Sequence, residues 1–233
     1  MLEPIDYRDG EARLTGWFAP PPAPPAPGVL VAHQAPGMGP HVKGVAERLA
    51  ELGYAAFALD LYGGEGFPMD EARALHERMM TEPGLMLRRA SAALDVLRAR
   101  PEVDPERLAA IGFCQGGITA LELARAGAPI RAAVGFHPGL KRPAGSRDGP
   151  IAAKVLMMVG DADPVVSVED RLAFAASMGA ARADWQLHLY GGVGHSFTDP
   201  AVDAYGFPGF RYDAAATRRS WASMAALLAE AFD

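Results

Sequence analysis

The chain opens with two segments in which apolar and polar residues alternate, at positions 3–8 and 11–18. Asp9-Gly10 stands between them, and a glycine at that place tolerates the positive φ of a tight turn. The pattern predicts an antiparallel hairpin. The proline-rich run at positions 20–27 lacks the backbone donors that a sheet or a helix needs, so we expect an extended surface loop there.

From Gly28 onward, short apolar runs alternate with longer segments of helical periodicity, and several runs are apolar on both faces, as strands inside a parallel sheet are. The pattern predicts strands at 29–32, 55–59, 108–113, 132–136, 155–159 and 185–190, and helices at 42–52, 85–98, 118–125, 168–178 and 214–232. This order predicts one α/β domain over residues 1–233, with a mostly parallel, doubly wound sheet and helices on both faces. Residues 63–84 are less regular, and we expect a lid or a pocket wall there.

Composition narrows the functional classes. The 233 residues are 50% hydrophobic and 21% charged, which is typical of a globular chain. The net charge is −6 and no basic cluster occurs, so nucleic acid is not an expected partner. The start of the chain resembles no leader, and no stretch reaches the roughly 18 apolar residues of a membrane span. We therefore expect a cytoplasmic protein without membrane contact, either a monomer or a small homo-oligomer.

The chain has a single cysteine, Cys114, which excludes an internal disulfide and a multi-cysteine metal site. It stands in Gly112-Phe113-Cys114-Gln115-Gly116-Gly117, between a predicted strand and a predicted helix. A nucleophile elbow needs this context, with small residues two before and two after the nucleophile. A lone cysteine is more often a small core residue, but the glycines favour a reactive thiol, which the helix N-terminus would hold as a thiolate. A dinucleotide-binding fingerprint would need glycine where Cys114 stands.

An elbow predicts an acid and then a base further along the chain, each on a loop after a later strand. Asp161 and Asp163 follow the strand at 155–159, and His195 follows the strand at 185–190. The histidine would take the thiol proton, and a carboxylate would hold its tautomer. Spacing alone leaves both aspartates open, although turn capping is the simpler interpretation of Asp161.

Three further residues could contact a substrate. His33 and His137 each follow a predicted strand, and each would either line a pocket or bond a backbone carbonyl. Phe197 lies in an aromatic segment broken by glycine and proline, which would form an apolar wall or pack onto the last helix. No metal-binding motif such as His-Glu-x-x-His occurs, so we expect no metal site.

Three motifs resemble the dienelactone hydrolase family of the α/β-hydrolase superfamily. They are the cysteine elbow at 112–117, the Gly-x-x-Asp-x-x-Val at 160–166 and the Gly-His-Ser-Phe at 194–197. The resemblance spans nearly the whole chain and implies an α/β-hydrolase fold, no cofactor, and hydrolysis of a carboxylic ester or lactone through a thioester on Cys114. It implies His195 as the base and Asp163 as the orienting acid. It also implies that the backbone N–H groups of Gln115 and Ala35 form the oxyanion hole.

Two positions depart from the family's pattern. Members that cleave dienelactones typically carry a glutamate where this chain has Gln34, and an arginine for the substrate carboxylate where it has Thr198-Asp199. Asp199 would repel a carboxylate, and Gln34 becomes a candidate substrate contact beside a thiol that we expect to rest as a thiolate. The alternative is a ligand-binding protein, or an acyl-transfer or thioester-cleaving enzyme, on the same fold.

Overall fold

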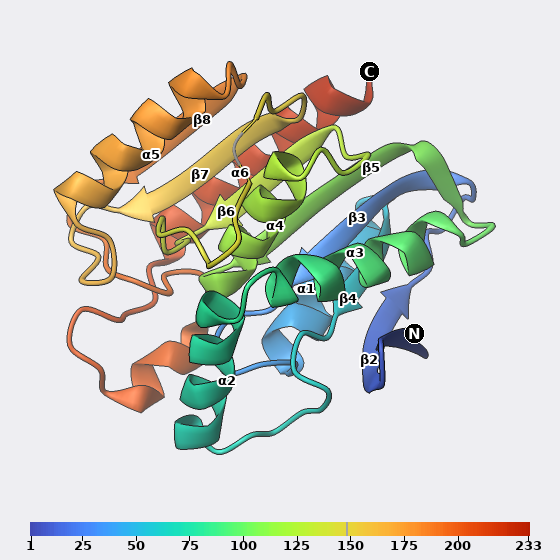
Figure 1. The fold of residues 1–233 in the computed structure, drawn as a ribbon, viewed down its shortest axis with the longest axis horizontal. Coiled ribbons are helices and arrows are strands. Elements are labelled where there is room, and N and C mark those ends of the chain that lie inside the picture. The colour runs from blue at the N-terminus through green and yellow to red at the C-terminus, as the bar shows by residue number, and fades with distance from the viewer. Residues whose placement is uncertain (148) are drawn as a thin grey trace.

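The computed structural model describes residues 1–147 and 149–233, whose strands form one eight-stranded sheet with helices on both faces (Figure 1). The strands are β1 (Glu3–Asp9), β2 (Ala12–Ala19), β3 (Ala26–Ala32), β4 (Ala55–Leu59), β5 (Val103–Phe113), β6 (Ala132–Phe136), β7 (Lys154–Gly160) and β8 (Trp185–Tyr190). The helices are α1 (Pro40–Glu51), α2 (Met69–Thr81), α3 (Leu85–Arg98), α4 (Gln115–Arg125), α5 (Val168–Ala180), the short 3-10 helix η1 (Pro200–Tyr205) and α6 (Ala214–Phe232).

The strand order is β1-β2-β4-β3-β5-β6-β7-β8. The β1–β2 and β2–β4 pairs are antiparallel, and the pairs from β4 to β8 are parallel. The predicted fold class, a mostly parallel sheet preceded by an antiparallel hairpin, is therefore confirmed. Among the residues that the structure describes, no helix is both long and apolar enough to cross a membrane.

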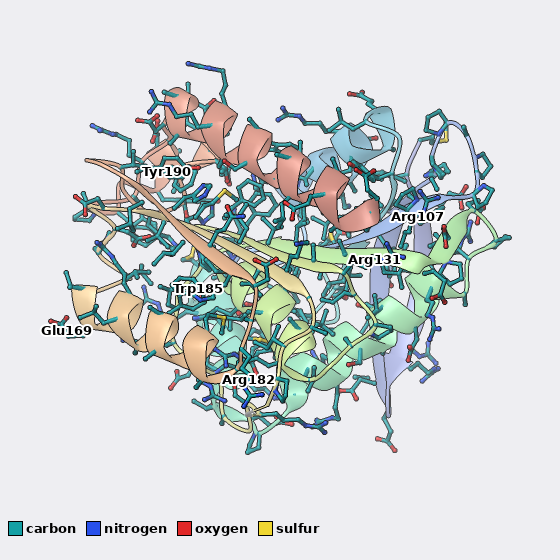
Figure 2. The ribbon with its side chains drawn as sticks, turned by 90° about the horizontal axis from the view of Figure 1, so that it is seen from above. Arg107, Arg131, Glu169, Arg182, Trp185 and Tyr190 are labelled. Carbon is teal, nitrogen blue, oxygen red and sulfur yellow. The ribbon has the colours of Figure 1, made fainter. Side chains whose placement is uncertain are left out.

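Alternate residues of the central strands face two separate apolar cores. Leu30 of β3 and Phe57 of β4 belong to a core shared with α3, α4 and α5. Val31 and Ala58, the next residues along the same strands, belong to a second core shared with α1 and α6. Figure 2 shows α5 and α6 on opposite sides of the sheet, whose edge strand β8 runs between the labelled Trp185 and Tyr190. Burial on both faces is the reason why the strand sequences are continuously apolar.

The main difference from the predicted elements is α2, which lies within the stretch 63–84 that the sequence pattern left irregular. Only Ala72 and Met79 of this helix are buried, so its apolar stripe is too narrow to reveal a helical period. Its start does carry a signal, since Pro68 precedes the helix and Asp70 and Glu71 occupy the first turn.

Two strands begin earlier than predicted. β3 starts at Ala26, inside the stretch 20–27 expected to be a loop, and the register against β5 shifts between Pro27 and Gly28. β5 itself starts at Val103, ahead of the predicted strand at 108–113, and contains Pro105. A proline inside a strand is compatible with such an irregularity, where one ladder donor is not needed.

The parallel strands all end at one edge of the sheet, and the candidate residues follow those ends. Ala35 comes after β3, Cys114 after β5, Asp163 after β7 and His195 after β8. Helix α2 and the loop that contains η1 lie at the same end of the molecule (Figure 1). Ligands of open α/β sheets bind at the carboxyl ends of the strands, so this edge is where a site is expected.

Candidate active site

Cys114 stands at a strained turn between β5 and α4. Its φ of 51° and ψ of −114° lie where a non-glycine residue is rarely found. A Cβ added at Gly112 would lie 2.2 Å from the backbone carbon of Gly116, and one at Gly116 would lie 2.1 Å from the carbonyl oxygen of Ala32. Strand and helix therefore meet backbone to backbone on both sides of the cysteine, which is the geometry of a nucleophile elbow.

His195 and Asp163 form a buried pair beside the cysteine. His195 Nδ1 lies 2.7 Å from Asp163 Oδ2, while Asp163 Oδ1 accepts a hydrogen bond of 2.8 Å from the backbone N–H of Val165. The carboxylate fixes the proton of the neutral ring on Nδ1 and leaves Nε2 available. Among the described residues Nε2 has no hydrogen-bond partner. Cys114 is nevertheless close enough for its charge to raise the pKa of His195. Asp161 is exposed and binds Arg171 at 3.2 Å instead.

The two groups shift each other's pKa in opposite directions. Burial alone would raise the pKa of the Cys114 thiol, but the charge of His195 and the backbone N–H groups of Gln115 and Ala35 lower it overall. Burial alone would lower the pKa of His195, but the charge of Cys114 and the hydrogen bond with Asp163 raise it to about 10. Each group therefore stabilises the charged form of the other.

Tyr62 links the two residues whose backbone amides act on the sulfur. Its hydroxyl lies 3.0 Å from the carbonyl oxygen of Ala35 and 3.0 Å from Gln115 Oε1, which His76 Nδ1 also contacts. Asp60 holds the turn that presents Tyr62, because its Oδ1 accepts the N–H of Tyr62 at 2.7 Å. The sequence patterns indicated no candidate at the end of β4, where Tyr62 follows. Its position after a parallel strand is the signal that could have found it.

The two positions that depart from the family's pattern contact each other. Gln34 Nε2 donates a hydrogen bond of 2.7 Å to Asp199 Oδ2, and the backbone N–H of Ala201 donates to Asp199 Oδ1 at 2.9 Å. Asp199 is buried, and Gln34 Oε1 has no hydrogen-bond partner among the residues described. The neutral amide that binds this buried carboxylate belongs to Gln34, which lines one small cavity together with Cys114.

The other candidates are packed beneath this site. His33 Nδ1 donates to the carbonyl of Gln34 at 2.8 Å, and its Nε2 accepts from the N–H of Leu61 at 3.1 Å, so both ring nitrogens are occupied. His137 is fully buried, with Nε2 2.8 Å from Thr198 Oγ1 and its ring centre 5.2 Å from that of His195. Burial and the charge of His195 hold the pKa of His137 well below its usual value. The equally buried Phe197 ring packs edge-on against His137.

Cys114 lines two cavities. The larger has a volume of about 480 Å³ and includes His195, together with Met69, Ala72, Arg73 and His76 from one face of α2. The smaller has a volume of about 100 Å³ and includes Gln34 and Ser196. Phe207 and Phe210 contribute to the walls of both. In the part of the chain that the structure describes, no group of three or more His, Cys, Asp or Glu side chains is arranged to hold a metal ion.

A strained elbow, a buried histidine–carboxylate pair and a mostly parallel sheet together define an α/β-hydrolase. The model of the dienelactone hydrolase family matches residues 14–232, so the chain belongs to that family. A Bradyrhizobium protein named "Probable 2-oxo-3-(5-oxofuran-2-ylidene)propanoate lactonase" is 30% identical over 208 residues, which cover 84% of either chain.

Two solved structures are similar over the whole chain. One is a dienelactone hydrolase-like promiscuous phosphotriesterase from metagenomic libraries, with 42% identity and a TM-score of 0.93, covering 100% of this chain and 99% of that one. The other is a protein named m3DLH, with 42% identity, a TM-score of 0.95 and the same coverage. The family and these relatives identify the protein as a hydrolase of carboxylic esters or lactones.

Proposed function

We propose that the protein hydrolyses a carboxylic ester or lactone through a thioester on Cys114. The observation that carries the proposal is the junction of Cys114 with the buried His195–Asp163 pair at the carboxyl ends of β5, β8 and β7. The opposite pKa shifts of Cys114 and His195 support a thiolate nucleophile that is ready before substrate binds.

In the first half of the reaction, the Cys114 sulfur attacks the carbonyl carbon. The resulting oxyanion accepts hydrogen bonds from the backbone N–H groups of Ala35 and Gln115. When the carbon–oxygen bond of the ester breaks, His195 gives its proton to the leaving oxygen, so that an alcohol departs, or remains attached in the case of a lactone.

In the second half, His195 takes a proton from water, and the water oxygen attacks the thioester carbon. The carbon–sulfur bond then breaks, which releases the acid and restores the thiolate. Asp163 keeps the imidazole in the required tautomer and stabilises its charged form in both halves. Gln34 is neutral, so its side chain places no negative charge that would disfavour the resting thiolate.

The test is turnover of a 4-nitrophenyl ester and a small lactone by the wild-type chain and by the Cys114→Ala variant. We expect a loss of about 10,000-fold or more, since the nucleophile and base act as a unit. Cys114→Ser is the matched variant, because it replaces the thiol with a hydroxyl and leaves the shape of the side chain nearly unchanged. It should retain only a small part of the activity. Unchanged turnover in Cys114→Ala would reject the mechanism.

Alkylation by iodoacetamide tests the charge state separately. An ordinary thiol has a pKa of about 8.5, and its alkylation slows about tenfold for each pH unit below that value. The lowered pKa of Cys114 predicts that its rate falls by clearly less than this between pH 8 and pH 7. A tenfold fall over that interval in the folded protein would contradict a resting thiolate.

A further inference from the structure

The reacting sulfur lies between two cavities of very different size. Cys114 lines both the cavity of about 480 Å³ and the cavity of about 100 Å³. Ala35, whose backbone N–H acts on the sulfur, also lines both. A carbonyl group held at the sulfur therefore has room on two sides, and its two substituents must point into different cavities.

The position of His195 determines which substituent of the carbonyl group occupies which cavity. His195 lines the larger cavity and is not among the described residues that line the smaller one. The leaving oxygen has to receive its proton from His195, so it has to lie on the side of the larger cavity. Given the proposed thioester mechanism, we propose that the leaving group occupies the larger cavity and the acyl group occupies the smaller one.

The smaller cavity sets a limit on acyl length. A volume of about 100 Å³ holds about three groups of the size of a water molecule or a methylene. It therefore accepts acyl groups from acetyl to butanoyl, which have one to three carbons beyond the carbonyl. Buried Val202 of η1 forms part of its wall, and the lining is mostly apolar.

One wall residue of the smaller cavity, Gln34, is held by a hydrogen bond. Gln34, Pro36 and Tyr205 line both this cavity and a third one of about 580 Å³, which also contains Asp199. The 2.7 Å hydrogen bond from Gln34 to Asp199 keeps that wall in place. A longer acyl chain would have to displace it, which would leave the buried carboxylate without this donor.

The larger cavity admits bulky apolar leaving groups. Met69 and Ala72 of α2 line it together with Phe207 and Phe210, and Met69 and the two phenylalanines also line the smaller cavity. In a lactone, the same assignment places the carbonyl-side ring carbons in the smaller cavity and the carbon that bears the ring oxygen toward the larger one. The substrate class is thus a short-chain ester of a bulky apolar alcohol, or a small lactone substituted next to its ring oxygen.

The first experiment measures kcat/KM of the full chain for two ester series. With 4-nitrophenol as a constant leaving group, kcat/KM should fall about tenfold or more between butanoate and hexanoate, because the added methylenes do not fit. With a constant acetyl group, 2-naphthyl acetate should be cleaved at least as fast as phenyl acetate. Equal or faster cleavage of hexanoate would overturn the inference. A chain that cleaves none of these esters would instead contradict the proposed function.

The second experiment compares two variants that each lose two methyl groups. Val202→Ala enlarges the smaller cavity and should raise the hexanoate-to-butanoate ratio of kcat/KM at least fivefold. Val165→Ala, on the wall of the larger cavity, should leave that ratio within twofold. A larger change of the ratio in Val165→Ala than in Val202→Ala would overturn the assignment. Thermal unfolding of both variants checks that they are folded, and the ester series on the wild-type chain does not depend on either variant.

Discussion

The two sides of the proposed reaction centre are held together by different kinds of contact. We call the segments around Cys114, Asp163 and His195 the catalytic side, after the proposed mechanism, and each of them contains a glycine pressed against another part of the backbone. A Cβ at Gly116, Gly160 or Gly194 would lie 2.1 Å from a carbonyl oxygen of the backbone. At these three glycines the main chains are in direct contact, so no side chain can be added there without moving the backbone.

The substrate side consists of Gln34, Asp199 and the cavity-facing residues of α2, and its contacts run between side chains. Gln34 binds Asp199 through its amide, and His76 of α2 reaches Gln115 through its ring. Gly39, which lines the third cavity, has open space where a Cβ would be. Side chains can be exchanged here without moving the backbone, so the position of the reacting groups is rigidly specified while substrate preference can change.

The largest effect should come from adding a methyl group on the catalytic side. Gly116→Ala would press a Cβ against the Ala32 carbonyl, and we expect a loss of about 3 kcal/mol or more of unfolding free energy. Gly44→Ala is the control, because it lies inside α1 with nothing within 4 Å and should stabilise the chain by about 0.5–1 kcal/mol. Urea unfolding measures both. A neutral Gly116→Ala would mean that the elbow is not closed by backbone contact.

A smaller effect should follow from removing a charge on the same side without changing shape. Asp163→Asn can no longer hold the imidazole tautomer or stabilise its charged form, and we expect kcat to fall about 100- to 10,000-fold. The raised pKa of His195 should fall too, which would move the alkaline loss of activity toward neutral pH. Asp161→Asn, in the exposed pair with Arg171, should stay within twofold of wild type. Equal losses in both variants would contradict the assignment of Asp163.

The smallest effect should come from a charge on the substrate side. Asp199→Asn removes a carboxylate near the acyl cavity, so kcat/KM for 4-nitrophenyl hemisuccinate should rise about fivefold relative to neutral 4-nitrophenyl butanoate. This gain should be smaller at high salt, because dissolved ions screen the repulsion between Asp199 and the carboxylate of the hemisuccinate. Asp203→Asn, on the exposed side of η1, provides the control of equal charge. No change in the ratio for Asp199→Asn would show that this carboxylate does not act on the substrate.

Much of the catalytic side could be predicted from the sequence because each of its parts has a local signature. The glycines around Cys114 stand at elbow spacing, and Asp163 and His195 follow apolar strands in the expected order. The choice between Asp161 and Asp163 rested on the family resemblance, since two positions two residues apart on one loop cannot be separated by strand spacing. The structure brings Asp163 to His195 and directs Asp161 toward Arg171.

The substrate side could not be predicted in the same way. Helix α2 buries so few side chains that the sequence shows no helical periodicity there. The sequence therefore gives no indication that His76 of this helix lies at the site. The sequence makes His137 and Phe197 candidates for substrate contact, and in the structure both are fully buried, with the His137 ring packed against His195 and Phe197. Whether a residue after a strand points into a cavity or under it depends on the loops that cover it.

The sequence by itself determined the order of the strands and of most helices, the class of fold and the chemical groups available at the strand ends, because periodicity and close glycine spacing are properties of neighbouring residues. Only the tertiary structure decided which side chains meet across the chain. The contact between Gln34 and Asp199 joins residues 165 positions apart, and the division of the pocket into a small and a large cavity depends on α2 and η1 closing over the same edge of the sheet. Such contacts arise from packing, which no local pattern records.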